Sequence, residues 1–161
     1  SVCKGIAAYL APAGMAADGY WIVGGGAKDT TDSGKMDEPF IAFARDLISD
    51  AGEDPSISLT GEGVFRGYAF TEAFRIADAL PGGMSRTNLM LALRNFKIYH
   101  PGLLDGLVTE LKGNSDAYFV EGSEYSQFDA ENQTWVMVGD VVDANGGTPN
   151  CRWDKANGGC R

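Results

Sequence analysis

The residues that could act as a nucleophile or a general base are few and far apart. His100 is the only histidine of the chain, so a Ser-His-Asp or Cys-His mechanism would have to use it. It stands in the turn sequence YHPG after a predicted helix, and nothing in the sequence places Cys3 or a serine beside it. We therefore interpret His100 as a structural or exposed turn residue and predict that the chain is not an enzyme. A small hydrolase that uses His100 is the alternative.

Three glycines, Gly24, Gly25 and Gly26, follow a predicted strand and invite comparison with a phosphate-binding loop. The P-loop pattern needs a lysine directly after its last glycine, but Ala27 intervenes here. The dinucleotide pattern fails as well, because Asp29 stands where its third glycine belongs. We therefore expect no cofactor at this segment and interpret the glycines as a hinge or a plain loop.

The segment DTTDSG, residues 29–34, resembles the first half of a calcium-binding loop with glycine at the sixth place. The twelfth place is Phe40 rather than the glutamate that supplies a bidentate ligand. We therefore predict no metal site.

The cysteines bear on the compartment in which the chain folds. Cys151 and Cys160 bracket the polar loop CRWDKANGGC, whose glycine pair lets the chain turn back. We interpret the two as a disulfide formed in an oxidising compartment, with two free thiols as the alternative. Zinc is disfavoured, because neither a CxxC motif nor a histidine lies nearby. Cys3 is left without a partner in this pairing. It either pairs with a cysteine in a part of the protein that is absent from this chain, or it is a buried free thiol.

Composition excludes several classes of function. The 161 residues are 44% hydrophobic and 22% charged, which is enough for a core and argues against disorder. The net charge of −9 disfavours nucleic acid as a partner. No stretch has the length and apolarity of a membrane span. The chain begins with Ser1 and shows no signal-peptide pattern, so we expect that a leader was removed by processing or truncation.

Helical periodicity dominates the first two thirds of the chain. Asp37 is a plausible N-cap for a helix with Pro39 in its first turn, and Gly52 is a C-terminal stop. Ser85 is a plausible cap for a later helix. The predicted helices are residues 4–13, 37–51, 62–80 and 85–96, and a buried strand is predicted over Tyr20 to Val23.

From residue 103 onward the apolar period falls to two, which indicates strands. The predicted strands are 107–111, 118–128 and 135–142, the last two joined as a hairpin by the loop DAENQT. The fold class is therefore α/β with an antiparallel tail. A single early strand cannot cover the wide apolar faces of three helices, so we expect that strands of the sheet are missing from this chain.

The order of these segments resembles the closing portion of the type I periplasmic binding proteins, in particular the branched-chain amino-acid-binding branch of ABC transporter receptors. The segments that carry the resemblance are DGYWIVGGGAKD, DEPFIAFARDLISDAG, GVFRGYAFTEAFRIADAL, SRTNLMLALRNF and YSQFDAENQTWVMVGDVVD. Together they span nearly all of residues 4–143, and their order carries more weight than any single motif. The resemblance implies the C-terminal part of a two-lobe fold with a terminal antiparallel β-hairpin.

The resemblance also implies a division of the chain between two lobes. Residues 1–22 and 113–161 would belong to the second lobe, the latter with the hairpin and the tail bracketed by cysteines. Residues 30–106 would complete the first lobe. Residues 23–29 and 107–112 would cross between the lobes, with Gly24 to Gly26 as the hinge.

The implied function is capture of a branched-chain or other hydrophobic or aromatic amino-acid-like solute by lobe closure. Phe65 and Tyr68 lie where relatives offer an aromatic side chain to the cleft, although their helical spacing also suits a core. Tyr20 and Trp21, near the crossover, are further candidates. The implied partners are the solute, ABC permease subunits and the missing N-terminal part of the same protein, in the periplasm or outside the cell, with or without a lipid anchor. A ligand-sensing receptor domain of the same fold is the alternative.

Overall fold

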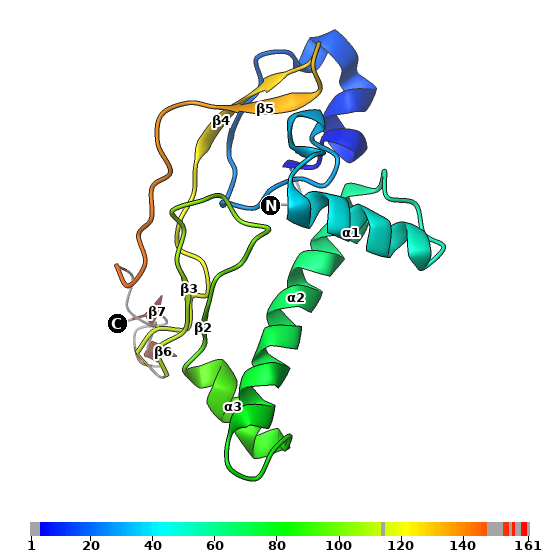
Figure 1. The fold of residues 1–161 in the computed structure, drawn as a ribbon. Helices are drawn as coiled ribbons and strands as arrows, with labels where there is room; N and C mark the ends of the chain where they lie inside the picture. Colours follow the sequence, from blue (N-terminus) through cyan, green and yellow to red (C-terminus); the bar gives the residue numbers. More distant parts are fainter. Residues whose placement is uncertain (1–3, 114, 148–152, 155, 157–158, 161) are drawn as a thin grey trace.

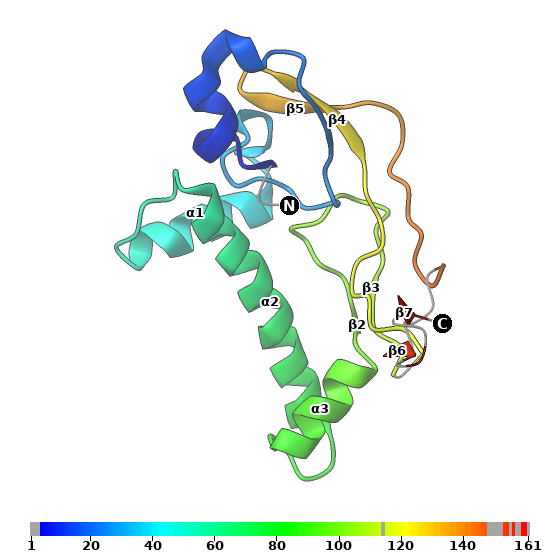
Figure 2. The same cartoon turned by 180° about the vertical axis from the view of Figure 1, so that it is seen from behind.

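The computed structural model describes residues 4–113, 115–147, 153–154, 156 and 159–160. Helices and small antiparallel sheets make up a mixed α/β structure, in agreement with the predicted class. Figures 1 and 2 show the three-stranded sheet and the N-terminal helical segments at one end, while α2 and α3 extend toward the other. The periplasmic-binding-protein architecture itself stays a prediction.

The three-stranded sheet has the order β1-β4-β5, with strands Trp21–Val23, Tyr125–Asp129 and Thr134–Met137. The hairpin β4–β5 confirms the one predicted around the loop DAENQT, with Phe128 opposite Trp135, but its strands are shorter than the predicted 118–128 and 135–142. Both side chains are buried against Ile6 and Leu10 of the N-terminal segment, and this cluster is the first of two cores among the described residues. That segment is a π-helical turn, η2 (Ile6–Leu10), followed by the 3₁₀ stretch η3 (Ala11–Ala17), rather than one α-helix over residues 4–13.

The opposite face of this sheet is open, which corrects the prediction of a buried strand at residues 20–23. Trp21 and Val23 are 53% and 58% exposed. Their cross-strand partners are Gln127 and Tyr125, and directly opposed residues of an antiparallel pair project from the same face. Aromatic and β-branched side chains favour a strand, but they are buried only if another part of the protein packs over them. Among the described residues, nothing packs over this face of the sheet.

Helices α1 (Pro39–Asp50) and α3 (Arg86–Arg94) lie close to where the sequence predicts them. The residue that caps α1 is Glu38 rather than Asp37, because the residue before a proline is held in an extended conformation and Glu38 has φ −68° and ψ 131°. Gly52 ends α1 with a φ of 80°. The Ser85 hydroxyl accepts a hydrogen bond from the Asn88 amide at 3.1 Å, as predicted.

Helix α2 (Ser58–Ala79) starts four residues before the predicted first residue, 62. Its buried face packs on α3 and α1, and Phe65 joins Phe40 and Ile41 in the second core. Phe70 and Phe74 of α2, and Phe43 of α1, are about half exposed. The wide apolar surface that the sequence predicts for this helix is therefore left partly uncovered on the Phe70 and Phe74 side.

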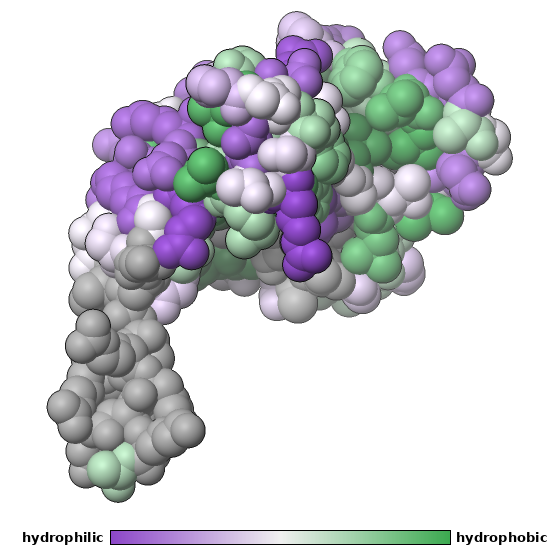
Figure 3. Space-filling model, turned by 90° about the horizontal axis from the view of Figure 1, so that it is seen from below, coloured by the Kyte–Doolittle hydropathy of each residue, from purple (hydrophilic) through white to green (hydrophobic). Residues whose placement is uncertain are grey.

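Seen from below in Figure 3, hydrophobic residues gather on the side of the molecule where α1 and α2 lie. No helix in the described part of the chain has both the length and the apolarity needed to cross a membrane.

The remaining strands are short. Strand β2 (Lys97–Ile98) follows α3 and pairs with β3 (Thr109–Glu110), so the strand predicted over 107–111 shrinks to two residues. Strands β6 (Trp153–Asp154) and β7 (Gly159–Cys160) pair near the C-terminus. The predicted disulfide involves Cys151, which like Cys3 lies outside the described residues.

The two carboxylates of segment 29–34 accept hydrogen bonds from backbone amides and from the Thr134 hydroxyl. Asp29 accepts hydrogen bonds from the amides of Ile6 and Thr31 at 2.6 and 3.0 Å. Asp32 accepts from the Gly34 amide, the Thr134 hydroxyl and the Trp135 amide. These contacts fasten the segment, including η4 (Ser33–Lys35), to the N-terminal turn and to β5.

Candidate functional site

A cavity of about 200 Å³, called here the junction cavity, lies where the glycine segment, α2 and two later loops meet. Its wall contains four polar or charged residues and a set of apolar ones. The polar residues are Lys28, Glu62, Arg66 and His100, and the others are Gly25, Ala27, Phe65, Leu103, Phe119 and Val120. Apolar walls with a few polar groups are typical of small-molecule sites.

An aromatic cluster borders this cavity. The rings of Phe40 and Phe65 meet edge to face at 5.2 Å, and the Tyr68 ring lies 5.1 Å from that of His100. Gly102 makes this packing possible, because a Cβ at this position would lie 2.3 Å from the Phe65 ring. Phe65 and His100 line the junction cavity, whereas Phe40 and Tyr68 line a different hollow.

That second hollow is a groove of about 550 Å³ between α1 and α2. Phe43, Leu47 and Val64 make its floor apolar, and Glu72 and Arg75 form an ion pair at 3.3 Å on its rim. Burial, together with the Glu72 carboxylate, raises the pKa of Tyr68 above its ordinary value.

His100 is buried, and both of its ring nitrogens bind backbone groups. Its Nε2 lies 3.0 Å from the Phe65 carbonyl oxygen, and its Nδ1 accepts from the Gly102 amide at 3.2 Å. Since a carbonyl can only accept, Nε2 carries the proton and the ring is neutral. His100 is therefore buried and bonded to backbone, so the option of an exposed turn residue is wrong, and its interpretation as a structural residue stays a prediction.

We expect the neutral His100 to make the fold less stable in acid. Burial lowers the pKa of His100 below its usual value of 6.5. The unfolded chain then binds a proton more readily than the folded one as pH falls below about 6.5, so the free energy of unfolding decreases, by at most about 1.4 kcal/mol per pH unit.

Urea unfolding of the wild type and of His100→Gln at pH 7.5 and 5.5 measures this contribution. The wild type should lose more stability than the variant between the two pH values. Equal losses would contradict a depressed His100 pKa, because the acidic residues that also titrate are common to both proteins.

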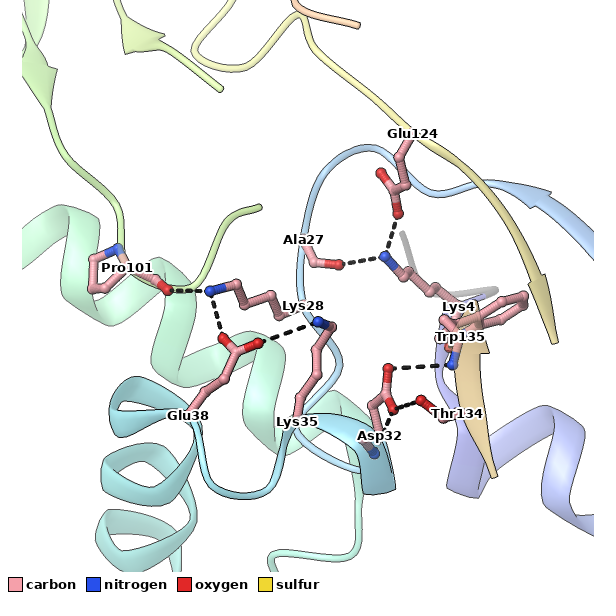
Figure 4. Close-up of polar contacts among 11 residues, drawn as sticks. Lys4, Ala27, Lys28, Asp32, Lys35, Glu38, Pro101, Glu124, Thr134 and Trp135 are labelled. Carbon is pink, nitrogen blue, oxygen red and sulfur yellow. Dashed lines mark hydrogen bonds and ion pairs between the residues drawn. The ribbon is translucent and has the colours of Figure 1, made fainter. Parts of the chain in front are cut away.

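Two ion pairs place charge at the cavity wall. Lys28 Nζ lies 2.5 Å from Glu38 Oε2 and donates to the Pro101 carbonyl at 3.3 Å (Figure 4). Partial burial acts to raise the pKa of Glu38, but hydrogen bonds from Lys28 and Lys35 outweigh it, and the pKa is lowered. On α2, Arg66 Nη2 lies 3.4 Å from Glu62 Oε2. The wall therefore carries charges of both signs.

Comparison with known proteins brings no match: no family model, curated protein or solved structure corresponds to this chain. Among the residues that the structure describes, no three His, Cys, Asp or Glu side chains are grouped so as to hold a metal ion.

The structure brings together some of the predicted site residues and separates others. Phe65 and Tyr68 belong to one aromatic cluster, and Gly25 reaches the same cavity as Phe65. Tyr20 and Trp21 are exposed at the sheet and line neither the cavity nor the groove.

Sequence reasoning missed the charged wall of the cavity. Glu62 and Arg66 flank Phe65 at a separation of four residues, a spacing that puts an ion pair on one helix face, and this signal could have revealed them. Lys28 offers no such local signal.

Proposed function

We propose that this chain is part of the substrate-binding component of an ABC transporter and captures an amino-acid-like solute with a branched, hydrophobic or aromatic side chain. The junction cavity carries the proposal. It combines apolar walls from Phe65 and Phe119 with the carboxylate of Glu62 and the cations of Arg66 and Lys28. A free amino acid presents the complementary set of groups, an ammonium, a carboxylate and an apolar side chain.

The proposed action is binding without chemistry. A solute that touches two parts of a hinged protein stabilises the closed arrangement by its differential contacts, and a permease reads that closed shape. The engagement of both His100 nitrogens by backbone groups supports this over hydrolysis, because neither nitrogen is available to activate a nucleophile.

Exposed apolar surface supports a further protein partner. Trp21 and Val23 on the open sheet face, and Phe43 and Leu47 in the α1–α2 groove, are about half exposed apolar side chains that a protein partner would cover. In the proposal, the preceding part of the same protein, which would complete the first lobe, packs against the groove, and permease subunits bind the closed form in the periplasm or at the cell surface.

Calorimetric titration with L-leucine, L-valine and L-phenylalanine tests the solute proposal. We expect micromolar or tighter binding by the protein that includes the preceding lobe, and much weaker binding by the 161 residues alone. An absence of heat with every amino acid in both proteins would contradict the proposal.

Phe65→Ala is expected to weaken solute binding about 10- to 100-fold. Loss of one buried aromatic contact is worth about 1.5–3 kcal/mol, and about 1.4 kcal/mol corresponds to a factor of ten. The matched control is Phe70→Ala, on the same helix but outside the junction cavity and half exposed. If both variants bind like the wild type, the cavity is not the solute site.

A further inference from the structure

A buried ion pair joins the beginning of the described chain to the segment that precedes β4. The Lys4 ammonium contacts Glu124 Oε1 and donates to the Ala27 carbonyl at 2.8 Å (Figure 4). The two side chains are only 5% and 0% exposed. Trp135 Nε1 donates to the Lys4 carbonyl at 3.0 Å, so the backbone of Lys4 is fixed as well.

The same carboxylate holds the glycine segment. Glu124 Oε2 accepts from the Gly26 amide at 2.8 Å, and the Glu124 backbone carbonyl accepts from the Gly24 amide at 3.0 Å. The Gly25 amide donates to the Ser123 hydroxyl at 2.9 Å. All three amides that the sequence places in a hinge are therefore bonded to residues 123–124.

The glycine at position 24 is required by this arrangement. A Cβ on Gly24 would lie 1.9 Å from Glu124 Oε1, in space that the carboxylate occupies. Gly26 has a φ of 77°, which side chains rarely permit, and its missing Cβ leaves room for Leu107. Glycine here permits close approach of the carboxylate and of Leu107.

We infer that Lys4 and Glu124 form a clasp that positions the glycine wall of the junction cavity. Gly25, Ala27 and Lys28 line the cavity, whereas Lys4 and Glu124 do not. The pair therefore acts through the backbone of 24–27, where Glu124 binds the Gly26 amide and Lys4 binds the Ala27 carbonyl. A buried charge that loses its partner is strongly disfavoured, so the pair has one favourable arrangement and resists opening. The inference concerns this backbone alone and does not depend on which solute binds.

Amide hydrogen exchange of the 161-residue chain tests the clasp. Glu124→Gln keeps the size of the side chain but removes the charge that holds Lys4. We expect the Gly24 and Gly26 amides to exchange at least about tenfold faster, while the Ala44 amide, in the buried face of α1, keeps its wild-type rate. The clasp is refuted if the glycine amides keep their rates, or accelerate only in step with Ala44 through global unfolding.

Two further variants keep the test decisive. Ser123→Ala removes only the acceptor of the Gly25 amide, so Gly25 alone should exchange faster. If Glu124→Gln does not fold, the double variant Lys4→Met/Glu124→Leu leaves no unpaired charge, and its Gly26 amide should exchange at least about tenfold faster than in the wild type. A slow Gly26 amide in that double variant would overturn the inference.

Discussion

Phe128→Ala is expected to lower the free energy of unfolding by about 3–5 kcal/mol, the usual cost of removing a large buried aromatic side chain. Phe128 is 1% exposed in the central strand β4, with its ring 5.4 Å from that of Trp135. It packs in one core with Ile6 and Leu10, so its loss leaves a cavity in that core. Urea unfolding followed by circular dichroism measures the change.

Tyr125→Ala is the matched control for this prediction. Tyr125 lies on the same strand but on the open face, 55% exposed, so its replacement should cost less than about 1 kcal/mol. Equal effects of the two substitutions would show that the covered and open faces of the sheet are not those described above.

Lys4→Met is the second substitution with a large expected effect, a loss of about 3–5 kcal/mol in the free energy of unfolding. Methionine approximates the length of lysine but leaves the Glu124 carboxylate buried opposite an apolar group. Loss of the attraction between Lys4 and Glu124 contributes less to this destabilisation than the Glu124 carboxylate, which stays buried away from water without a compensating charge. Urea unfolding again gives the measurement.

Two control variants distinguish the effect of an unpaired buried carboxylate from the simple loss of a positive charge. Lys97→Met removes one partner of the pair with Glu110, but the Lys97 side chain is 67% exposed, so a change of about 0–1 kcal/mol is expected. The double variant Lys4→Met/Glu124→Leu should recover most of the stability lost in Lys4→Met, since no buried charge remains. A Lys4→Met protein as stable as the Lys97→Met protein would exclude an important role for the pair.

The clasp restricts where the chain can bend during lobe closure in the proposed transport function. A glycine run suggests a flexible joint, but the amides of Gly24, Gly25 and Gly26 all have acceptors. Bending at these residues would break those bonds together with a buried ion pair. The prediction of a hinge at Gly24 to Gly26 therefore implies that closure and release of the clasp are coupled, and hydrogen exchange with and without L-leucine can measure this coupling.

Elements with strong local signals were predictable from sequence. Pro39 and Gly52 bound α1 because proline fixes the first turn and glycine accepts the positive φ at the end. Ser85 begins α3 because its hydroxyl satisfies a free amide three residues later. The alternation around Phe128 and Trp135 indicates a hairpin with one apolar face, which the register confirms. Each signal acts over a few residues, so tertiary structure was not needed to read it.

For the candidate site, the sequence predicted Phe65 and Tyr68 but not their surroundings. Periodicity puts both on α2, yet only the fold shows that Phe65 faces the junction cavity and Tyr68 the groove. The exposure of Trp21 and Phe70 could not be predicted from the sequence either, because the type of an apolar residue does not show whether another part of the protein covers it.

The mixed α/β class, the main helices and the hairpin follow from local patterns in the sequence. The pairing of Lys4 with Glu124, 120 positions away, and the attachment of β5 to Asp32 emerge only from the fold. The same is true of the burial of His100 among aromatic rings. The physical reason is one of range: caps, turns and periodicity depend on neighbours in the chain, whereas the partner of a buried charge depends on which distant segments folding brings together.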